Sequence, residues 1–153
     1  MSGQKRFKVI HVVRRFAFEE WGGTETVVWN SARKLAEKGV DSEIFTTRAC
    51  SGSGDEVRDG VPIRRFDYFY PYWPLSAARI RALDKKGGNP LSPGLFKALE
   101  ESDCDLVHIH TAGRLAQQAI LIAHRRRIPA VVSFHGGCRD VPAAEMREML
   151  RPI

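Results

Sequence analysis

Histidines and glycines that follow apolar runs are the residues of this sequence best suited to chemistry. His135 comes directly after the apolar run 129–134 and directly before Gly136 and Gly137. A histidine can donate or accept a hydrogen bond near neutral pH, and glycines allow a ligand to approach the backbone closely. We therefore predict that His135 projects into a crevice and binds a hydroxyl group. The alternative is a capping histidine that only holds the loop.

A second pair of histidines, His108 and His110, lies in the run 105–110. Two residues apart on a strand, they point to the same face of a sheet. His110 is at the carboxyl end and is the better candidate for binding, whereas His108 is expected to be structural. A metal site would need a third ligand. His124 belongs to another expected element, so we predict no metal site.

The third candidate is the Gly22-Gly23 pair, which is followed by Thr24 and an amphipathic segment. Paired glycines before a helix N-terminus offer backbone N–H groups and a partial positive charge to a phosphate. We expect Thr24 to cap this helix. The alternative is that the glycines only make a tight turn. The pattern is neither GxGxxG nor a Walker loop, so it does not predict binding of NAD or a P-loop.

Alternating apolar runs and helical patterns predict the elements that must position these residues. Strands are expected over 7–13, 40–47, 61–66, 105–110 and 129–134, and helices over 24–38, 77–83, 93–101, 113–127 and 141–150. Residues 48–60 are expected to form a loop. The class is α/β, a Rossmann-like three-layer sandwich with a mainly parallel sheet, in which ligands bind at the carboxyl ends of the strands.

Helical spacing also predicts the buried faces of two helices. The expected inward residues are Val27, Val28, Ala32, Leu35 and Ala36 in the first, and Leu115, Ala119, Ile120, Ile122 and Ala123 in the second. The run 129–134 is expected to be buried on both faces of the sheet. The aromatic residues of segment 67–76 are expected to pack against the domain, with stacking on a sugar or lipid as the alternative.

The composition indicates one globular domain over residues 1–153, with 43% hydrophobic and 27% charged residues. Three cysteines without CxxC spacing argue against a disulfide framework and favour a reducing, cytoplasmic setting. No signal peptide or membrane-spanning run is present. The net charge of +6 is spread over short basic clusters without interleaved aromatics, so no nucleic-acid partner is predicted. Peripheral contact with an anionic membrane is compatible with the charge.

Several motifs together resemble the N-terminal domain of group 1 (family 4) glycosyltransferases, which have the GT-B fold. The first is a Gly-Gly-x-Glu loop and a helix that ends in Leu-Ala-x-x-Gly. The others resemble the family's Asp-hydrophobic-hydrophobic-His-x-His strand and its strand ending in His-Gly, here with a serine in place of threonine. The matching residues are Gly22, Gly23, Glu25, Leu35, Ala36, Gly39, Asp105, His108, His110, Ser133, His135 and Gly136.

The resemblance implies a sugar transfer from a nucleotide-sugar donor to a sugar or lipid acceptor, with retention of configuration and without a metal or other cofactor. It implies that Gly22 and Gly23 approach the donor diphosphate and that His135 contacts the transferred sugar. Arg14 and Arg15 are basic residues near Gly22 and Gly23 in the sequence, and their positive charge could stabilise the departing diphosphate. The family's C-terminal domain, with its Glu-x7-Glu motif, binds most of the nucleotide.

The chain ends at Ile153 within or just after an expected helix. We therefore expect the N-terminal half of a GT-B fold, truncated at its C-terminal end, without the nucleotide-sugar-binding domain and inactive alone. Two alternatives remain open at this point. One is a non-catalytic module that binds a sugar, lipid head group or partner, and the other is half of a sugar-nucleotide epimerase.

Overall fold

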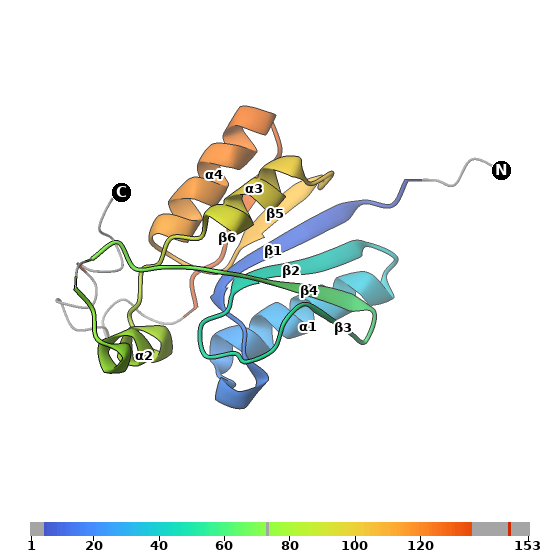
Figure 1. Cartoon of the computed structure of the whole chain (residues 1–153). Coiled ribbons are helices and arrows are strands. Elements are labelled where there is room, and N and C mark those ends of the chain that lie inside the picture. The colour runs from blue at the N-terminus through green and yellow to red at the C-terminus, as the bar shows by residue number, and fades with distance from the viewer. Residues whose placement is uncertain (1–4, 73, 136–146, 148–153) are drawn as a thin grey trace.

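A computed structural model describes residues 5–72, 74–135 and 147 of the chain (Figure 1). The expected helix over 141–150 and the predicted site residue Gly136 lie outside the described residues. Six strands form one sheet in the order β3-β4-β2-β1-β5-β6. The strands are β1 (Lys8–Arg15), β2 (Asp41–Thr47), β3 (Glu56–Arg58), β4 (Val61–Phe66), β5 (Leu106–Ile109) and β6 (Ala130–Val132). The helices are η1 (Phe18–Glu20), α1 (Gly23–Glu37), α2 (Ala77–Lys85), α3 (Pro93–Glu101) and α4 (Arg114–Arg126).

The sheet separates two apolar cores, which makes a three-layer sandwich. Helix α1 packs on one face, where Val28 and Ala32 meet Val13 and Ile44 of the sheet. Helices α3 and α4 pack on the other face, over a core that includes the alternate residues of β1 and β5 (Figure 1). Every strand pair except β3–β4 is parallel. The predicted α/β fold class with a mainly parallel sheet is therefore confirmed.

One strand lies where the sequence analysis expected only a loop. β3 pairs antiparallel with β4, and Arg58 faces Val61 across a two-residue turn. Asp59 and Gly60 form that turn with φ angles of 45° and 76°. Asp-Gly suits a turn that needs two positive φ angles, because glycine pays no steric cost there. The dipeptide was the available signal for this hairpin.

The start of α1 differs from the prediction. Gly22 is the N-cap residue and no side chain caps the helix, so the expected capping role of Thr24 is wrong. The helix ends as expected, with Lys38 at the C-cap and Gly39 at a φ of 80°. Val27 is exposed although Val28 is buried. Adjacent residues on a helix are about 100° apart, so Val27 is rotated away from the sheet.

Two further apolar positions are more exposed than predicted. Ile120 of α4 is 41% exposed, whereas Ala119, Ile122 and Ala123 are buried as expected. The run 129–134 is not buried on both faces, because Val131 is 46% and Phe134 is 74% exposed. β6 is the last strand of the sheet in the described part of the chain, so it has only one strand beside it there.

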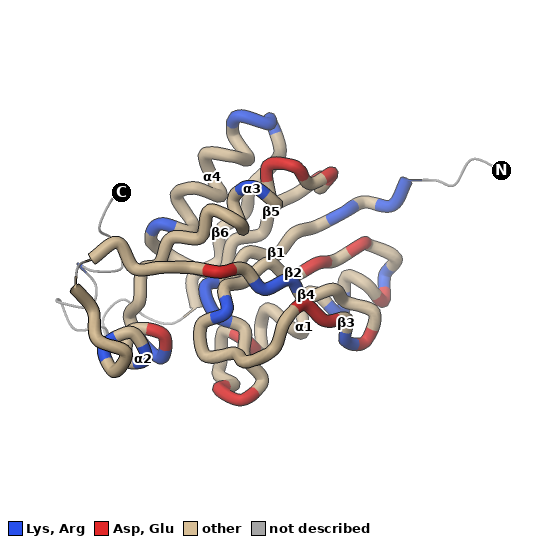
Figure 2. The backbone as a smooth tube through the Cα atoms, in the orientation of Figure 1, with Lys and Arg blue, Asp and Glu red and all other residues tan. Residues whose placement is uncertain are grey.

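Charge and hydropathy add two observations. Lys and Arg residues lie near the N-terminus, along α2 and at the end of α4, not along one element (Figure 2). Within the described residues, no helix is both long and apolar enough to cross a membrane.

Candidate functional site

Parallel pairing of β1, β5 and β6 brings distant histidines together on one face of the sheet. His11 of β1 lies beside His108 of β5, which lies beside Val131 of β6. His110 follows β5 and His135 follows β6 by a few residues. These strands run in the same direction, so His110 and His135 both lie at the carboxyl edge of the sheet, whereas His11 lies in the middle of β1. The carboxyl edge is where ligands bind in open α/β sheets.

Three consecutive hydrogen bonds join a serine and three histidines, which we call the histidine row (Ser42, His11, His110 and His135). The Oγ of Ser42 is 3.0 Å from Nε2 of His11, and Nδ1 of His11 is 3.0 Å from Nε2 of His110. Nδ1 of His110 is in turn 2.9 Å from Nε2 of His135. Both ring nitrogens of His11 and His110 are thus engaged.

The two central rings of the histidine row are held in the neutral form. His11 is fully buried and His110 is 3% exposed. Burial, together with the nearby His108, lowers the pKa of His11 to about 3. Burial also lowers the pKa of His110 to about 3, with further contributions from the three neighbouring histidines. A neutral imidazole has one N–H donor and one acceptor nitrogen. Each of these two rings therefore donates one of its hydrogen bonds in the row and accepts the other.

His108 forms a side branch. Its Nε2 is 2.8 Å from Oγ of Ser133, and its ring centroid is 3.8 Å from that of His110. Ring nitrogens of His11, His108 and His110 lie within 4.8 Å of one another. His11, and not His124, is thus the third histidine that is close enough to share a metal ion with His108 and His110. His11 and His110 already share a hydrogen bond with each other.

His11 and Ser42 were not among the residues predicted from the sequence. His11 lies in the middle of an apolar run, where nothing in the local pattern marks it as functional. Parallel pairing of the first and fourth predicted strands was the signal that would have placed it beside His108.

The glycine loop is built around a buried ion pair. Nε of Arg15, at the end of β1, donates a 2.9 Å hydrogen bond to Oε1 of Glu25, which is 3% exposed. A Cβ atom at Gly22 would lie 3.1 Å from Oε2 of Glu25, whereas one at Gly23 would meet nothing within 4 Å. In the Gly-Gly-x-Glu pattern, Gly22 thus lies against the carboxylate of Glu25, which joins α1 to β1 through its hydrogen bond with Arg15.

Arg14 and Arg15 also bind the segment that contains α2. Nη1 of Arg14 donates to the backbone carbonyls of Leu83 and Asp84 at 3.2 and 2.9 Å. Nη1 of Arg15 donates to the carbonyl of Lys85 at 3.1 Å. Both arginines therefore have protein partners that orient the loops at this edge. Their contact with a diphosphate stays a prediction, as do the binding roles of Gly22, Gly23, Thr24, His110 and Gly136.

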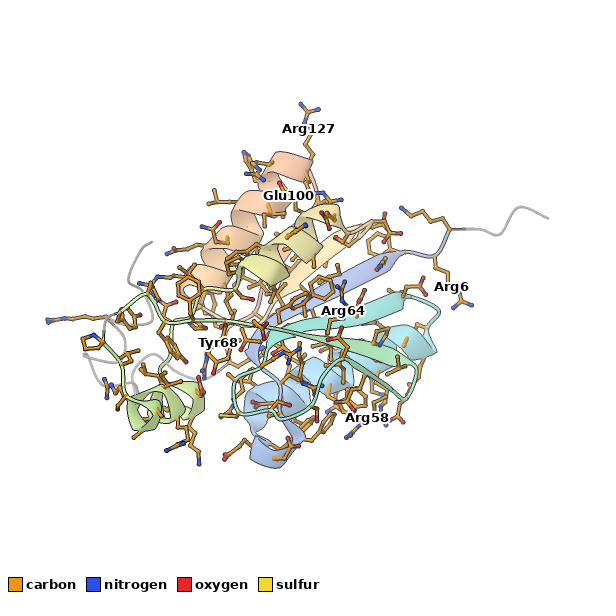
Figure 3. The ribbon with its side chains drawn as sticks, viewed as in Figure 1. Arg6, Arg58, Arg64, Tyr68, Glu100 and Arg127 are labelled. Carbon is orange, nitrogen blue, oxygen red and sulfur yellow. The ribbon has the colours of Figure 1, made fainter. Side chains whose placement is uncertain are left out.

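The tyrosines of the aromatic segment before α2 pack against the domain as predicted, whereas Phe69 is 50% exposed. The hydroxyls of Tyr68 and Tyr70 donate to the two carboxylate oxygens of buried Asp84 at 2.7 and 2.8 Å. Figure 3 labels Tyr68 among the side chains of the domain. Burial and these hydrogen bonds to Asp84 raise the pKa of both tyrosines above the ordinary range. Arg114 donates to the hydroxyl of Tyr72 at 2.7 Å. Trp73 lies outside the described residues.

A cavity of about 670 Å³ lies at the opposite end of β1 and β2, away from the carboxyl ends of the strands. Its wall carries charges of both signs, including Arg6, Lys8, Arg33, Glu43 and Asp59. Ser42 also borders it, although only 5% of this residue is exposed. The cavity is therefore near Ser42, at one end of the histidine row, and not near His135 at the other end.

Comparison with known proteins agrees with this arrangement. Residues 22–152 match the family described as the glycosyl transferase 4-like domain. Over 121 residues the chain is 34% identical to D-inositol 3-phosphate glycosyltransferase 1 of Catenulispora acidiphila. That alignment covers 74% of this chain and 26% of the relative, so the chain matches about a quarter of the relative's length. With its Rossmann-like sandwich and its histidines gathered by β1, β5 and β6, the chain belongs to the glycosyl transferase 4-like family, as the N-terminal type of GT-B domain.

Proposed function

We propose that this domain forms the acceptor-side wall of a glycosyltransferase that moves a sugar from a nucleotide-sugar donor to a sugar or lipid acceptor. The observation that supports this most is the position of His135, which ends a row of hydrogen-bonded histidines at the carboxyl edge of the sheet. A ring held in this way can present its second nitrogen to a substrate in a fixed orientation. The transfer would retain configuration and need neither metal nor cofactor.

The glycine loop would serve the donor diphosphate. α1 begins at Gly23 without a side-chain cap, so its first backbone N–H groups point toward the loop and carry the positive end of the helix dipole. Gly22 and Gly23 add no side chain that would keep a phosphate away. Arg14, Arg15 and Thr24 would add positive potential and a hydroxyl at the same edge. His110 and Gly136 would complete the sugar-binding side of the crevice.

The nucleotide itself would be bound mostly by a second domain outside these 153 residues. We therefore expect the isolated chain to bind UDP-, GDP- and ADP-sugars weakly and to show no turnover. Calorimetric titration of the isolated chain checks this, and tight binding of any of the three would contradict it. Reading the gene past codon 153 checks the domain itself. A further domain with a Glu-x7-Glu motif supports the enzyme, whereas a stop codon favours a non-catalytic binding module.

The role of His135 is tested in the enzyme that contains both domains. We expect His135→Ala to reduce turnover by about 100-fold or more, in the range of losses for a group that contacts the reacting centre. His124→Ala is the matched control, because His124 is an exposed histidine on α4. Turnover like that of the wild type in His135→Ala, with a folded protein, would rule out the assignment.

We place the enzyme in the cytoplasm, with peripheral contact to anionic lipid through its excess of positive charge. Co-sedimentation with anionic vesicles at low and high salt checks this contact. Binding at low salt that disappears at high salt is expected, because salt screens charge attraction. No binding at low salt would remove the membrane contact from the proposal.

A further inference from the structure

The histidine row extends from Ser42, near the start of β2, to His135, the proposed sugar-binding residue. Ser42 and His11 do not contact His135 directly; bonds of 3.0, 3.0 and 2.9 Å run in sequence from Ser42 to His11, to His110 and to His135. His11 and His110 use both ring nitrogens in these bonds. In a neutral ring one nitrogen carries the proton and the other does not, so the tautomer of each ring sets that of the next.

Only two arrangements satisfy all three bonds. In the first, every donor points toward His135: the Ser42 hydroxyl donates to His11, His11 Nδ1–H donates to His110, and His110 Nδ1–H donates to His135. His135 then accepts at Nε2 and carries its proton on Nδ1. In the second, every bond is reversed, so His135 donates from Nε2 and its Nδ1 is bare. The Ser42 hydroxyl would then accept from His11 and would need a different acceptor for its own proton.

The surroundings of Ser42 favour the first arrangement. Among the described residues, the Ser42 hydroxyl has His11 Nε2 as its hydrogen-bond partner, and Ser42 is only 5% exposed. Reversal would leave the Ser42 hydroxyl proton without a protein acceptor among the described residues, and only water in the cavity that Ser42 borders could accept it. A buried donor that loses its protein partner is destabilising, so the first arrangement is favoured over the second.

We propose that Ser42 and His11 are positioning residues that fix His135 in the Nδ1–H tautomer, so that His135 presents a hydrogen-bond donor, not a base, to an oxygen of the substrate. The donor part of this statement rests on the proposed contact of His135 with the sugar. The tautomer part does not, because it concerns this chain alone. A donor at this place would bind a sugar hydroxyl or a developing negative charge on oxygen.

Nitrogen-15 NMR of the histidine rings in the whole chain tests the tautomer directly, since protonated and bare ring nitrogens have well-separated chemical shifts. We expect His135 of the wild type near neutral pH to be mainly Nδ1–H. Ser42→Ala removes the hydroxyl donor three bonds away and is expected to lower the Nδ1–H to Nε2–H ratio at His135 at least threefold. Ser42→Thr keeps a hydroxyl, so its Nδ1–H to Nε2–H ratio at His135 is expected to match that of the wild type. A mainly Nε2–H His135 in the wild type would overturn the proposal.

Ser133→Ala is the matched control. It removes a serine that binds the side-branch His108 and does not belong to the row, so the His135 ratio is expected to stay unchanged. Equal ratios in the wild type and Ser42→Ala, with dispersed spectra that show both proteins folded, would overturn the proposal. So would a change in Ser133→Ala as large as that in Ser42→Ala.

A zinc titration separates the row from a metal centre, because His11, His108 and His110 lie close enough to share an ion. After treatment with a chelator, one equivalent of Zn²⁺ is expected to leave the ring shifts unchanged. Stoichiometric binding of Zn²⁺ that changes the chemical shifts of all three rings would overturn the proposal, because the histidines would then form a metal site. These results concern only the tautomer. If His135→Ala left turnover intact while the tautomer results held, the proposed function would fail and the coupling within the row would stand.

Discussion

Glu25 accepts a 2.9 Å hydrogen bond from Nε of Arg15, and this ion pair joins the end of β1 to the first turn of α1. The side chains are 3% and 17% exposed, so little water screens the pair. Burial alone would lower the pKa of Arg15, but the hydrogen bond and the charge of Glu25 outweigh it and raise the pKa.

Removal of this carboxylate is expected to destabilise the domain strongly. Glu25→Ala leaves the Arg15 charge largely buried without its partner, and we expect a loss of about 2–4 kcal/mol in the free energy of unfolding. Urea denaturation measures this loss. Glu37→Ala is the control, because it breaks the exposed pair with Arg33 on the same helix and is expected to cost less than about 0.5 kcal/mol. Similar losses in both variants would contradict the importance of the buried pair.

The two glycines of the loop are expected to respond differently to alanine. A Cβ at Gly22 would lie 3.1 Å from Glu25 Oε2 at an N-cap position, where alanine is unfavourable, so Gly22→Ala should cost about 1 kcal/mol or more. Gly23→Ala adds a methyl group with nothing within 4 Å in the first turn of α1. It should be neutral or stabilise the domain by up to about 1 kcal/mol.

Thermal unfolding of both glycine variants provides the comparison. A melting temperature that falls for Gly22→Ala and does not fall for Gly23→Ala is the expected pattern. The reverse order would show that the carboxylate of Glu25 does not restrict position 22.

Acid is expected to destabilise the domain through its buried histidines. The pKa of His11 falls from 6.5 to about 3 on folding, so the unfolded chain binds this proton more readily. Stability is therefore complete above about pH 7 and is lost as the pH falls from about 6.5 toward 3. Between about pH 7 and 5.5, His11 alone should remove roughly 1 kcal/mol from the free energy of unfolding.

Urea denaturation of the wild type and of His11→Asn across this pH range checks the effect. Asparagine cannot be protonated there, so the variant should show a shallower dependence of stability on pH even if it is less stable throughout. Parallel curves for the two proteins would show that His11 does not carry this pH dependence.

A side chain at Gly88 is expected to destabilise the domain. A Cβ there would lie 2.3 Å from the Tyr70 hydroxyl and 2.4 Å from the carbonyl oxygen of Leu83. A backbone oxygen cannot move away without disturbing the end of α2, so Gly88→Ala should cost about 1–3 kcal/mol. Gly52→Ala, with nothing within 4 Å of its Cβ, is the control and should change stability little. A loss at Gly88 no greater than at Gly52 would contradict the close packing around Tyr70.

The sequence was sufficient to predict the fold class, because local patterns mark the principal elements. The apolar run at β1, the Lys38-Gly39 helix end and the helix after Ser92 were all expected and are all present. Patterns of this kind report which residues leave water but not which side of an element a neighbouring element covers. The exposure of Val27 and Val131 depends on where α1 and the last described strand lie, and local spacing carries no such information.

The candidate site was predicted less completely than the fold. His110 and His135 could be selected because both follow strands, where ligands bind in this class of fold. His11 could not be selected in the same way, since its role depends on the pairing of β1 with β5. The partners of Arg14 and Arg15 around α2 also arise from tertiary packing, because they are about 70 residues away along the chain.

The separation of β1 and β5 along the chain has a consequence for the order of folding. His11 and His110 are 99 residues apart, whereas His11 and Ser42 are only 31 residues apart. A growing polypeptide that has emerged only as far as β4 already contains His11 and Ser42 but has no His110 to continue the row. Contacts between distant parts of a chain form slowly, because closing a long loop costs entropy before the contact stabilises it. We therefore expect the histidine row to form late in folding, after β5 and β6 have joined the sheet, so that the ring signals of the row would report that step.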